Sequence, residues 1–351
     1  MKKKDCAAFA VFTASVLLAV GYSNRATAAD HADAAALKIF APLPEVIPGG
    51  AGAPTEEQVS LGRMLYFDAR LSRSQTISCN TCHPLASYGM DGQATSEGYR
   101  GQHGKRNAPS VYNAAGHFAQ FWDGRAADVE EQAKGPVRNP VEMAVISERD
   151  IVAVLESMPE YVTSFRNAFP NDPEPVCFDN MAIAIGAFER KLLTPGRWDQ
   201  FLRGDQASLT ASEKTGLQAF LTAGCQNCHA GALLGGTSFH KLGVAKPYPD
   251  TSDPGRFNVT ENEADRMFFK VPSLRNVAVT GPYFHNGEVT SLSVAVAQMA
   301  EYQRGRRLSD RQVGEIVTWL GALTGDIPAE YINEPRLPKC TATTPKPETG
   351  D

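Results

Sequence analysis

Two copies of one short motif set the strongest limit on what this chain can fold around. The sequence contains "CNTCH" at Cys79–His83 and "CQNCH" at Cys225–His229, and both have the spacing C-x-x-C-H. This spacing is the attachment signature of c-type haem, in which two cysteine thiols bond to the porphyrin and the next histidine ligates the iron. The sequence therefore predicts two covalently bound haem c groups, held by Cys79, Cys82, His83, Cys225, Cys228 and His229.

Two other uses of paired cysteines fit the pattern less well. A structural zinc site needs four ligands in one module, but the two motifs lie more than 140 residues apart. A redox-active C-x-x-C needs no histidine after its second cysteine, whereas both copies have one. We therefore interpret both motifs as haem sites.

The sequence around the motifs repeats as well. The segment "APSVYNAAGHFAQFWDG" (108–124) aligns without a gap to "VPSLRNVAVTGPYFHNG" (271–287). A capped helical pattern precedes each motif, at 55–67 and at 210–221. Shared spacing over this length indicates an internal repeat. The sequence thus predicts a mainly α fold of two cytochrome c-like lobes, each enclosing one haem.

The remaining patterns suggest how the chain is divided. Helical periodicity continues at 147–158, 179–193 and 308–325, with caps at Ser147 and Ser309 and an end at Gly325, and strand signals are sparse. A chain of 351 residues is long enough for two units. We expect an N-terminal haem domain, a C-terminal haem domain and an extended, proline-rich tail, at 29–193, 194–330 and 331–351.

The first 28 residues read as a secretory signal peptide. A basic start, "MKKKD", precedes an apolar run that is short for a bilayer span, and "ATA" provides a small-residue cleavage site. We expect export to the periplasm. Loss of four basic residues and one acid changes the formal charge from −5 to −8, which makes nucleic acid a poor partner. An oxidising compartment favours a disulfide between Cys177 and Cys340, and two separate thiols are the alternative.

The two halves differ where a second iron ligand is expected. Met299 lies twelve residues after Gly287 in the second half, and the aligned position in the first half is Pro136, which cannot ligate iron. A thioether ligand opposite histidine raises the reduction potential of a haem. The pattern favours Met299 as the second ligand of the C-terminal haem, and Met267 stays open as an alternative.

Three residues of the first half are further candidates for the chemistry. Trp122 aligns with His285 and is either a core residue or an electron conduit between the haems. Gln132 and Glu142 lie near a haem that lacks a methionine, so they are candidate polar groups for a reactive iron, although most glutamates are solvated.

Taken together, these motifs resemble those of the bacterial dihaem cytochrome c peroxidases. The similarity is collinear over nearly the whole mature chain, through "ISCNTCH", "RNAPSVYNA", "AQFWDGRA", "EQAKGPVRNPVEM", "FDNMAIAI", "GCQNCH", "LRNVAVTGPYFHNG" and "AVAQM". The resemblance implies that the haem on His83 is the peroxidatic site. It also implies that the haem between His229 and Met299 is the high-potential site where electrons enter.

The same resemblance implies roles for other residues and partners. Trp122 would lie between the haems, Glu142 would move the proton of peroxide to the leaving oxygen, and Gln132 would help to orient peroxide. Hydrogen peroxide would be reduced to water with electrons from a small cytochrome c or a cupredoxin. The enzyme would be a homodimer whose assembly calcium favours. The sequence itself, through its charge and the lack of another long apolar stretch, predicts no nucleic acid and no membrane span.

A calcium ion between the lobes is also implied by the resemblance. The matching positions are Asn107, through its side chain, and Thr280 and Pro282, through their backbone carbonyls. Oxygen ligands of this kind suit a hard cation.

One departure from the family's pattern falls in the loop "SEGYRGQHGKRNAP" at 96–109. Many members supply from this loop a distal histidine that caps the peroxidatic haem at rest. Here that position is Tyr99, and His103 follows four residues later. Three interpretations stay open: the haem rests uncapped and needs no reductive activation, Tyr99 ligates it as phenolate, or His103 ligates it through a shifted glycine-rich loop.

Two functions of other kinds also stay open. One is a dihaem enzyme of the same superfamily that matures a partner protein by oxidising its tryptophans, and such enzymes keep a tyrosine ligand in the region of Met299. The other is an electron carrier without catalysis, which Glu142 and Gln132 disfavour. Turnover of peroxide with a reduced small cytochrome separates the enzyme from the carrier.

Overall fold

The computed structural model describes residues 34–49 and 52–348, so the predicted signal peptide at 1–28 lies outside the described residues. The described residues are mainly helical, as the sequence predicts, and include a small antiparallel sheet of β1 (Phe239–Lys241) and β2 (Phe268–Lys270). No helix in these ranges is long and apolar enough to cross a membrane. The α-helices are α1 (Ala34–Leu37), α2 (Glu56–Phe67), α3 (Cys79–Cys82), α4 (Val129–Arg138), α5 (Glu148–Glu156), α6 (Pro159–Ala168), α7 (Phe178–Glu189), α8 (Arg197–Leu202), α9 (Ala211–Ala223), α10 (Phe257–Thr260), α11 (Leu292–Arg304) and α12 (Asp310–Gly321).

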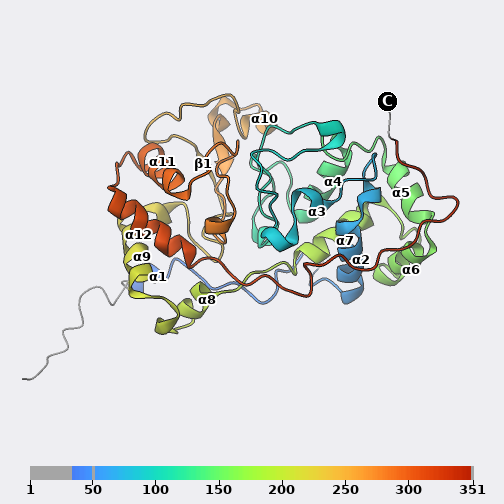
Figure 1. Ribbon diagram of the computed structural model, residues 1–351, viewed down its shortest axis with the longest axis horizontal. Coiled ribbons are helices and arrows are strands. Elements are labelled where there is room, and N and C mark those ends of the chain that lie inside the picture. The colour runs from blue at the N-terminus through green and yellow to red at the C-terminus, as the bar shows by residue number, and fades with distance from the viewer. Residues whose placement is uncertain (1–33, 50–51, 349–351) are drawn as a thin grey trace, which may run out of the picture.

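The helices form two lobes that lie side by side (Figure 1). The N-terminal lobe contains α2 to α7, and the C-terminal lobe contains α8, α9, α11, α12 and the small sheet. Each lobe has its own hydrophobic core, one including Leu61, Phe165 and Phe188 and the other including Trp198 and Trp319. The chain therefore buries two separate cores.

In each lobe the helix before the motif crosses the last helix at a glycine. α2 packs against α7, and α9 packs against α12. A Cβ atom on Gly62 would lie 1.8 Å from the carbonyl oxygen of Ala184, and one on Gly216 would lie 2.0 Å from the carbonyl oxygen of Glu315. Only glycine lets the two backbones approach this closely. The same device fixes both helix pairs.

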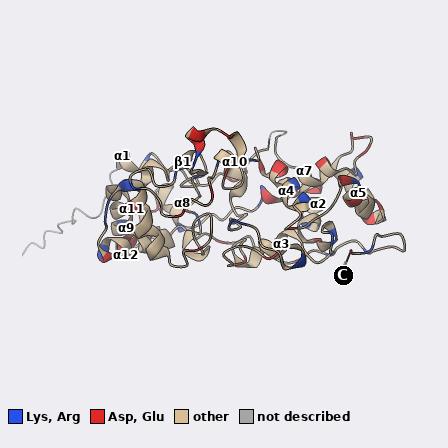
Figure 2. Cartoon of the chain, turned by 90° about the horizontal axis from the view of Figure 1, so that it is seen from above, with Lys and Arg blue, Asp and Glu red and all other residues tan. Residues whose placement is uncertain are grey.

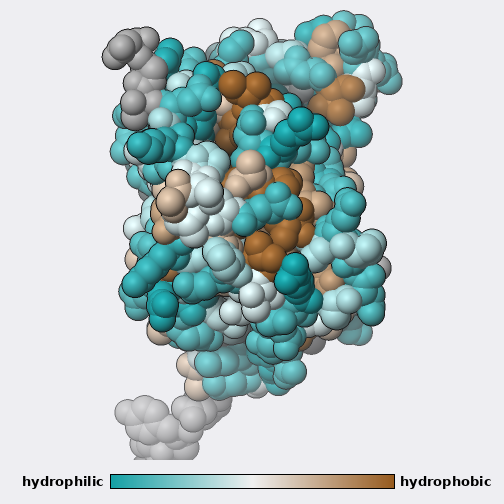
Figure 3. Space-filling view, turned by 90° about the vertical axis from the view of Figure 1, so that its right-hand side faces the viewer, coloured by the Kyte–Doolittle hydropathy of each residue, from teal (hydrophilic) through white to brown (hydrophobic). Residues whose placement is uncertain are grey.

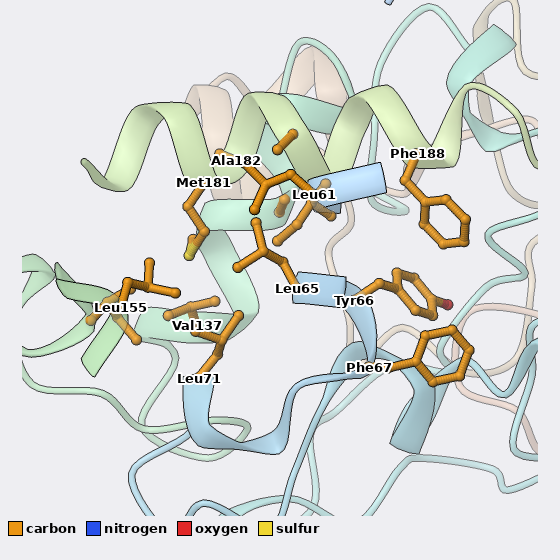
Figure 4. Close-up of a cluster of buried hydrophobic side chains, with 14 of the residues drawn as sticks. Leu61, Leu65, Tyr66, Phe67, Leu71, Val137, Leu155, Met181, Ala182 and Phe188 are labelled. Atoms are coloured by element: carbon orange, nitrogen blue, oxygen red, sulfur yellow. The ribbon is translucent and has the colours of Figure 1, made fainter. Parts of the chain in front are cut away.

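The core of the N-terminal lobe supports the first motif directly. Figure 4 shows Leu65 and Tyr66 of α2 among the side chains buried near Phe188 of α7. The rings of Tyr66 and Phe188 lie 5.4 Å apart, edge to face. The Tyr66 hydroxyl donates a hydrogen bond to the carbonyl of His83 at 2.7 Å. Packing of α2 on α7 thus positions the histidine that ends the motif.

The helix starts predicted from the sequence are confirmed. Each predicted cap accepts a hydrogen bond from the backbone N–H three residues later, at Thr55 (α2), Ser147 (α5), Thr210 (α9) and Ser309 (α12). The predicted end of the last helix is wrong, because α12 stops at Gly321. Gly325 instead packs on the linker of the two lobes, the segment between α7 and α8. A Cβ atom on Gly325 would lie 1.9 Å from the Thr194 carbonyl oxygen in this linker.

Both ends of the described chain cross to the opposite lobe (Figure 1). Near the N-terminus, the ring of Phe40 lies 5.4 Å from that of Trp198 in the C-terminal lobe. Beyond α12, the extended tail runs over the N-terminal lobe, where the Pro338 carbonyl accepts a hydrogen bond from Arg70 at 2.8 Å. The segment expected to open the N-terminal domain therefore begins in contact with the other lobe.

One buried hydroxyl joins the lobes at their linker. Thr194 is 0% exposed, and its Oγ1 accepts hydrogen bonds from Nδ2 of Asn113 at 2.8 Å and of Asn276 at 2.9 Å. These asparagines occupy aligned positions of the segments 108–124 and 271–287, and both have φ of 62°. The junction is built from the same residue type in the same conformation on its two sides.

The surface mixes both signs of charge. Figure 2 shows Lys and Arg interspersed with Asp and Glu on both lobes. The end of the N-terminal lobe is mostly hydrophilic, with apolar residues gathered near the middle of that face (Figure 3).

Candidate haem sites

Both motif histidines have the ring orientation of a metal ligand. Nδ1 of His83 lies 3.3 Å from the carbonyl oxygen of Gly89, and Nδ1 of His229 lies 3.0 Å from the carbonyl oxygen of Leu234. Because a carbonyl can only accept, each Nδ1 carries the proton, which leaves Nε2 with a free lone pair. A second contact of this kind is usual for metal-binding histidines.

Burial keeps both imidazoles in the neutral form that binds metals. It lowers the pKa of His83, and it lowers the pKa of His229 to about 4. The cysteines of each motif line the same cavity as their histidine. The residues present therefore fit a c-type haem at each motif.

The C-terminal cavity brings Met299 and His229 together. Both residues line this cavity, which has a volume of about 270 Å³. Met267 is not among the described residues that line it; this side chain is 6% exposed and packs in a small cluster with Phe269. Of the two candidate thioethers, Met299 is therefore the one that lines the same cavity as His229.

The N-terminal cavity is larger and has no methionine at the equivalent place. Glu142, Gln132 and Pro136 line it together with His83, and its volume is about 1350 Å³. Pro136 lies inside α4, at the position that aligns with Met299 on α11. Glu142 and Gln132 are therefore polar side chains that share this cavity with His83.

Two residues that the sequence analysis did not predict as site residues, Asn139 and Arg125, act on the carboxyl of Glu142. Its Oε1 accepts a hydrogen bond from Asn139 Nδ2 at 2.7 Å. Burial raises the pKa of Glu142, while Arg125 and the Asn139 amide act in the opposite direction. The Arg125 guanidinium lies 3.4 Å from the centre of the Phe121 ring and pairs with Asp123 at 3.0 Å. Asn139 and Arg125 do stand in the motifs "EQAKGPVRNPVEM" and "AQFWDGRA", but only the fold brings them to Glu142.

Trp122 lines both cavities. Its indole Nε1 donates a hydrogen bond to the Asn107 carbonyl at 2.9 Å, and its ring lies 6.4 Å from the imidazole of His285. His285 also lines both cavities and stacks on Phe269 at 4.4 Å. The indole therefore lies between the two candidate haem sites.

The loop at 96–109 holds Tyr99 in the protein core. Tyr99 is 6% exposed, and the guanidinium groups of Arg73 and Arg100 lie 5.6 and 5.3 Å from its ring centre. Its hydroxyl has no hydrogen-bond partner among the described residues, and it does not line the N-terminal cavity. The Tyr99 N–H donates to the Glu142 carbonyl at 2.8 Å. The loop thus docks on the segment that carries Glu142.

His103 is an exposed residue that does line the N-terminal cavity. Its Nδ1 lies 3.1 Å from the Thr95 carbonyl oxygen, and a β-bridge pairs His103 with Glu97. Because the carbonyl accepts, Nε2 is the ring nitrogen left free for a metal.

The three predicted calcium ligands line the same cavity. Asn107, Thr280 and Pro282 all line the C-terminal cavity. Asn107 is 4% exposed, and its Nδ2 donates to the carbonyls of Gln93 at 3.0 Å and Ala94 at 3.4 Å. The amide is therefore oriented with its oxygen turned away from those carbonyls, as a cation ligand requires.

The structure does not join Cys177 to Cys340. Both are free thiols. The sulfur of Cys177 caps α7 by accepting from the Asn180 N–H at 3.4 Å, whereas the sulfur of Cys340 accepts from Arg70 Nη1 at 3.4 Å. The tail is thus held on the N-terminal lobe by polar contacts, and the two sulfurs have separate partners.

Comparisons with known proteins show the family to which the chain is similar. Residues 56–207 match the family model described as di-haem cytochrome c peroxidase. The chain is 46% identical to the cytochrome c551 peroxidase of Pseudomonas aeruginosa, over 94% of this chain and 96% of that one. It is 45% identical to the cytochrome c551 peroxidase of Nitrosomonas europaea, over 87% and 89% of the two chains.

A solved structure gives the same result for the fold. The chain resembles the crystal structure of a MauG-like protein associated with microbial copper homeostasis, with a TM-score of 0.71 and 27% identity over 84% of this chain and 95% of that one. The chain therefore belongs to the di-haem cytochrome c peroxidase family and is an enzyme of the cytochrome-c peroxidase class.

Proposed function

We propose that this chain is a periplasmic dihaem enzyme that reduces hydrogen peroxide to water with electrons from a small cytochrome c or a cupredoxin. The observation that carries the proposal is the pairing of two unlike cavities around one indole. Met299 and His229 line one cavity, and Glu142 and His83 line the other. Trp122 lines both cavities, which supports it as the route for electrons between them.

Each cavity would hold one haem, bonded through the cysteines of its motif and ligated by Nε2 of its histidine. When bound, haem supplies the one-electron and peroxide chemistry that no side chain provides. Met299 would hold the iron of the C-terminal haem together with His229, and a thioether ligand would suit that site to electron entry. Pro136 leaves the N-terminal site open to substrate. Duplication of one lobe, followed by these substitutions, accounts for the pair.

Glu142 is the acid–base group of the N-terminal cavity in this proposal. Reduction of hydrogen peroxide to two waters consumes two electrons and two protons. The Glu142 carboxylate accepts a proton from one peroxide oxygen and returns it to the other, which then leaves as water rather than hydroxide. Burial, which raises the pKa of Glu142, makes this carboxylate a better base. Asn139 holds Oε1 in place, and Gln132 orients the peroxide.

We further propose that the N-terminal site rests open in the oxidised enzyme. The Tyr99 side chain is packed in the core, and its backbone is tied to Glu142. No ordered movement of this loop is then needed before peroxide binds. Calcium at Asn107, Thr280 and Pro282 and a homodimeric assembly complete the proposal.

Electron paramagnetic resonance of the fully oxidised protein, with calcium present, tests the resting state. An open site gives a high-spin ferric signal that Tyr99→Phe leaves unchanged. A purely low-spin spectrum that turns high-spin on half-reduction contradicts the open site. Loss of that low-spin signal in His103→Ala would then identify His103 as the cap, and its loss in Tyr99→Phe would identify the phenolate.

Turnover tests the activity itself. The enzyme should oxidise a reduced small cytochrome or cupredoxin when peroxide is added. Normal redox cycling without turnover would contradict the peroxidase proposal and leave an electron carrier. Oxidation of a partner protein's tryptophans stays a second candidate, and the presence of Met299 in the C-terminal cavity disfavours it.

A further inference from the structure

A lysine and a histidine from different lobes face each other beside the C-terminal cavity. Lys270 ends β2, and His117 belongs to the N-terminal-lobe segment 108–124. Nζ of Lys270 lies 3.0 Å from Nδ1 of His117, and both residues line this cavity. Lys270 is 5% exposed. Neither residue has a part in the proposed reaction.

The pair has no acid in contact with it among the described residues. Lys270 makes no salt bridge with any residue that the structure describes. The acid that acts on it, Asp123, is already paired with Arg106 and Arg125. Burial lowers the pKa of Lys270 to about 7, against the attraction of Asp123, and burial with the charge of Lys270 lowers the pKa of His117. A buried ammonium without an anion is costly, so the contents of the cavity are expected to supply one.

Backbone hydrogen bonds fix the positions of the two segments that carry Lys270 and His117. The Lys270 N–H donates to the Trp122 carbonyl at 2.8 Å, and the Phe118 N–H donates to the Gly236 carbonyl at 2.9 Å. The His117 ring packs on Gly236, where a Cβ atom would lie 2.3 Å from the ring carbon Cδ2. With His117 neutral, Nδ1 accepts one ammonium proton, and two donors remain for a ligand in the cavity.

We propose that Lys270, positioned by His117, is the carboxylate-binding group of the C-terminal cavity and takes a propionate of the haem. The inference rests on the proposed haem between His229 and Met299. A carboxylate accepts charge-assisted hydrogen bonds from an ammonium, and the propionate would be the anion that the Lys270 ammonium lacks. A fixed positive charge beside a haem favours its reduced form, so Lys270 raises the reduction potential of the electron-entry site.

The test substitutes Lys270→Gln in the full-length holoprotein. The pyridine haemochrome assay counts covalent haems, spectroelectrochemical titration gives the midpoint potential of each, and resonance Raman reports the propionate vibrations. We expect two haems, a lower midpoint potential for the C-terminal haem, a smaller change for the N-terminal haem and altered propionate bands. The control is Lys241→Gln, which removes the same charge from an exposed position on β1 and should leave all three readouts unchanged.

Two substitutions of His117 test whether this residue positions the Lys270 ammonium. His117→Asn keeps a polar side chain that can accept from the ammonium and should hold the midpoint potential near the wild-type value. His117→Leu removes the acceptor and should lower the midpoint potential toward that of Lys270→Gln. Equal potentials in His117→Leu and wild type would contradict the positioning role.

The outcomes separate this inference from the proposed function. Two haems with unchanged potentials and propionate bands in Lys270→Gln would overturn the inference alone. A wild-type potential that depends on added acetate or chloride, with unaltered propionate bands in the variant, would assign the site to a free anion and also overturn it. A wild-type protein with a single covalent haem would instead contradict the proposed function.

Discussion

Glu142, which is half-buried, and Glu189, which is buried, both line the N-terminal cavity, and their surroundings differ. Glu142 is hydrogen-bonded to the Asn139 amide and faces the charge of Arg125. Glu189, on α7, is 4% exposed, and burial together with the charge of Glu130 raises its pKa to about 8. One carboxyl is thus arranged to exchange a proton, and the other is arranged to keep one at neutral pH.

Glu142→Gln should remove acid–base catalysis and preserve the site. Glutamine keeps the shape of the side chain but cannot carry the peroxide proton. We expect kcat with peroxide to fall by roughly 10²- to 10⁴-fold, with haem content and the resting spectrum unchanged. Steady-state oxidation of a reduced small cytochrome measures the effect, with the exposed Glu148→Gln as control. A kcat equal to that of the control would rule out this role for Glu142.

Glu189 should make the stability of the protein depend on pH. In the unfolded chain this carboxyl ionises near its ordinary value of 4.5, whereas the folded protein keeps its proton up to about 8. Between these values the folded state binds more protons, so the free energy of unfolding falls as pH rises. Between pH 5 and pH 8, the free energy of unfolding of the wild type should fall by on the order of 4 kcal/mol at most, measured by urea unfolding. Glu189→Gln should lack this fall. Exposed Glu131→Gln should keep the wild-type dependence, and the same dependence in Glu189→Gln would show that another group causes it.

At the scale of the elements, each lobe depends on one close crossing of helices. Gly62→Ala would push a methyl group against the backbone of α7, and Gly216→Ala would do so against α12. We expect each change to lower the free energy of unfolding by about 1–3 kcal/mol or more.

Gly314→Ala is the matched control for these crossings. It lies on α12 with nothing within 4 Å of the added Cβ, so it should be neutral or stabilise the helix by up to about 1 kcal/mol. Chemical unfolding monitored by circular dichroism compares the three variants. If Gly62→Ala matched Gly314→Ala, the crossing at Gly62 would not be tight.

The elements were largely predictable because their signals are local. Caps such as Thr210 act within one helical turn, and the C-x-x-C-H spacing fixes cysteines and histidine within five residues. Contacts between distant elements were not predictable in the same way. The burial of Tyr99 and the place of Arg125 beside Glu142 follow from long-range packing, which no short pattern specifies. Met299 could be separated from Met267 only when the fold placed one of them in the cavity.

For the molecule as a whole, the linker hydroxyl of Thr194 holds the two lobes in register. Thr194→Val keeps the shape of the side chain but leaves the buried Nδ2 groups of Asn113 and Asn276 without their acceptor. Since an unsatisfied buried donor costs about 1–3 kcal/mol, we expect a loss of about 2–5 kcal/mol in the free energy of unfolding. Thr194→Ser should recover most of this loss, and exposed Thr163→Val should cause little. Equal stability of Thr194→Val and Thr194→Ser in urea would contradict the role of the hydroxyl.

Because the chain ends cross between the lobes, neither lobe can be completed from its own half of the sequence. Phe40 enters the C-terminal core, although it precedes Trp198 by 158 residues. Tyr331, from the tail, packs against Phe188 of the N-terminal core at 5.5 Å. During synthesis, the N-terminal lobe therefore lacks part of its core until the tail has been made. The C-terminal lobe in turn packs around residues that were made near the start of the chain. A protease cut near Thr194 would accordingly leave two fragments that stay associated, each holding part of the other's core.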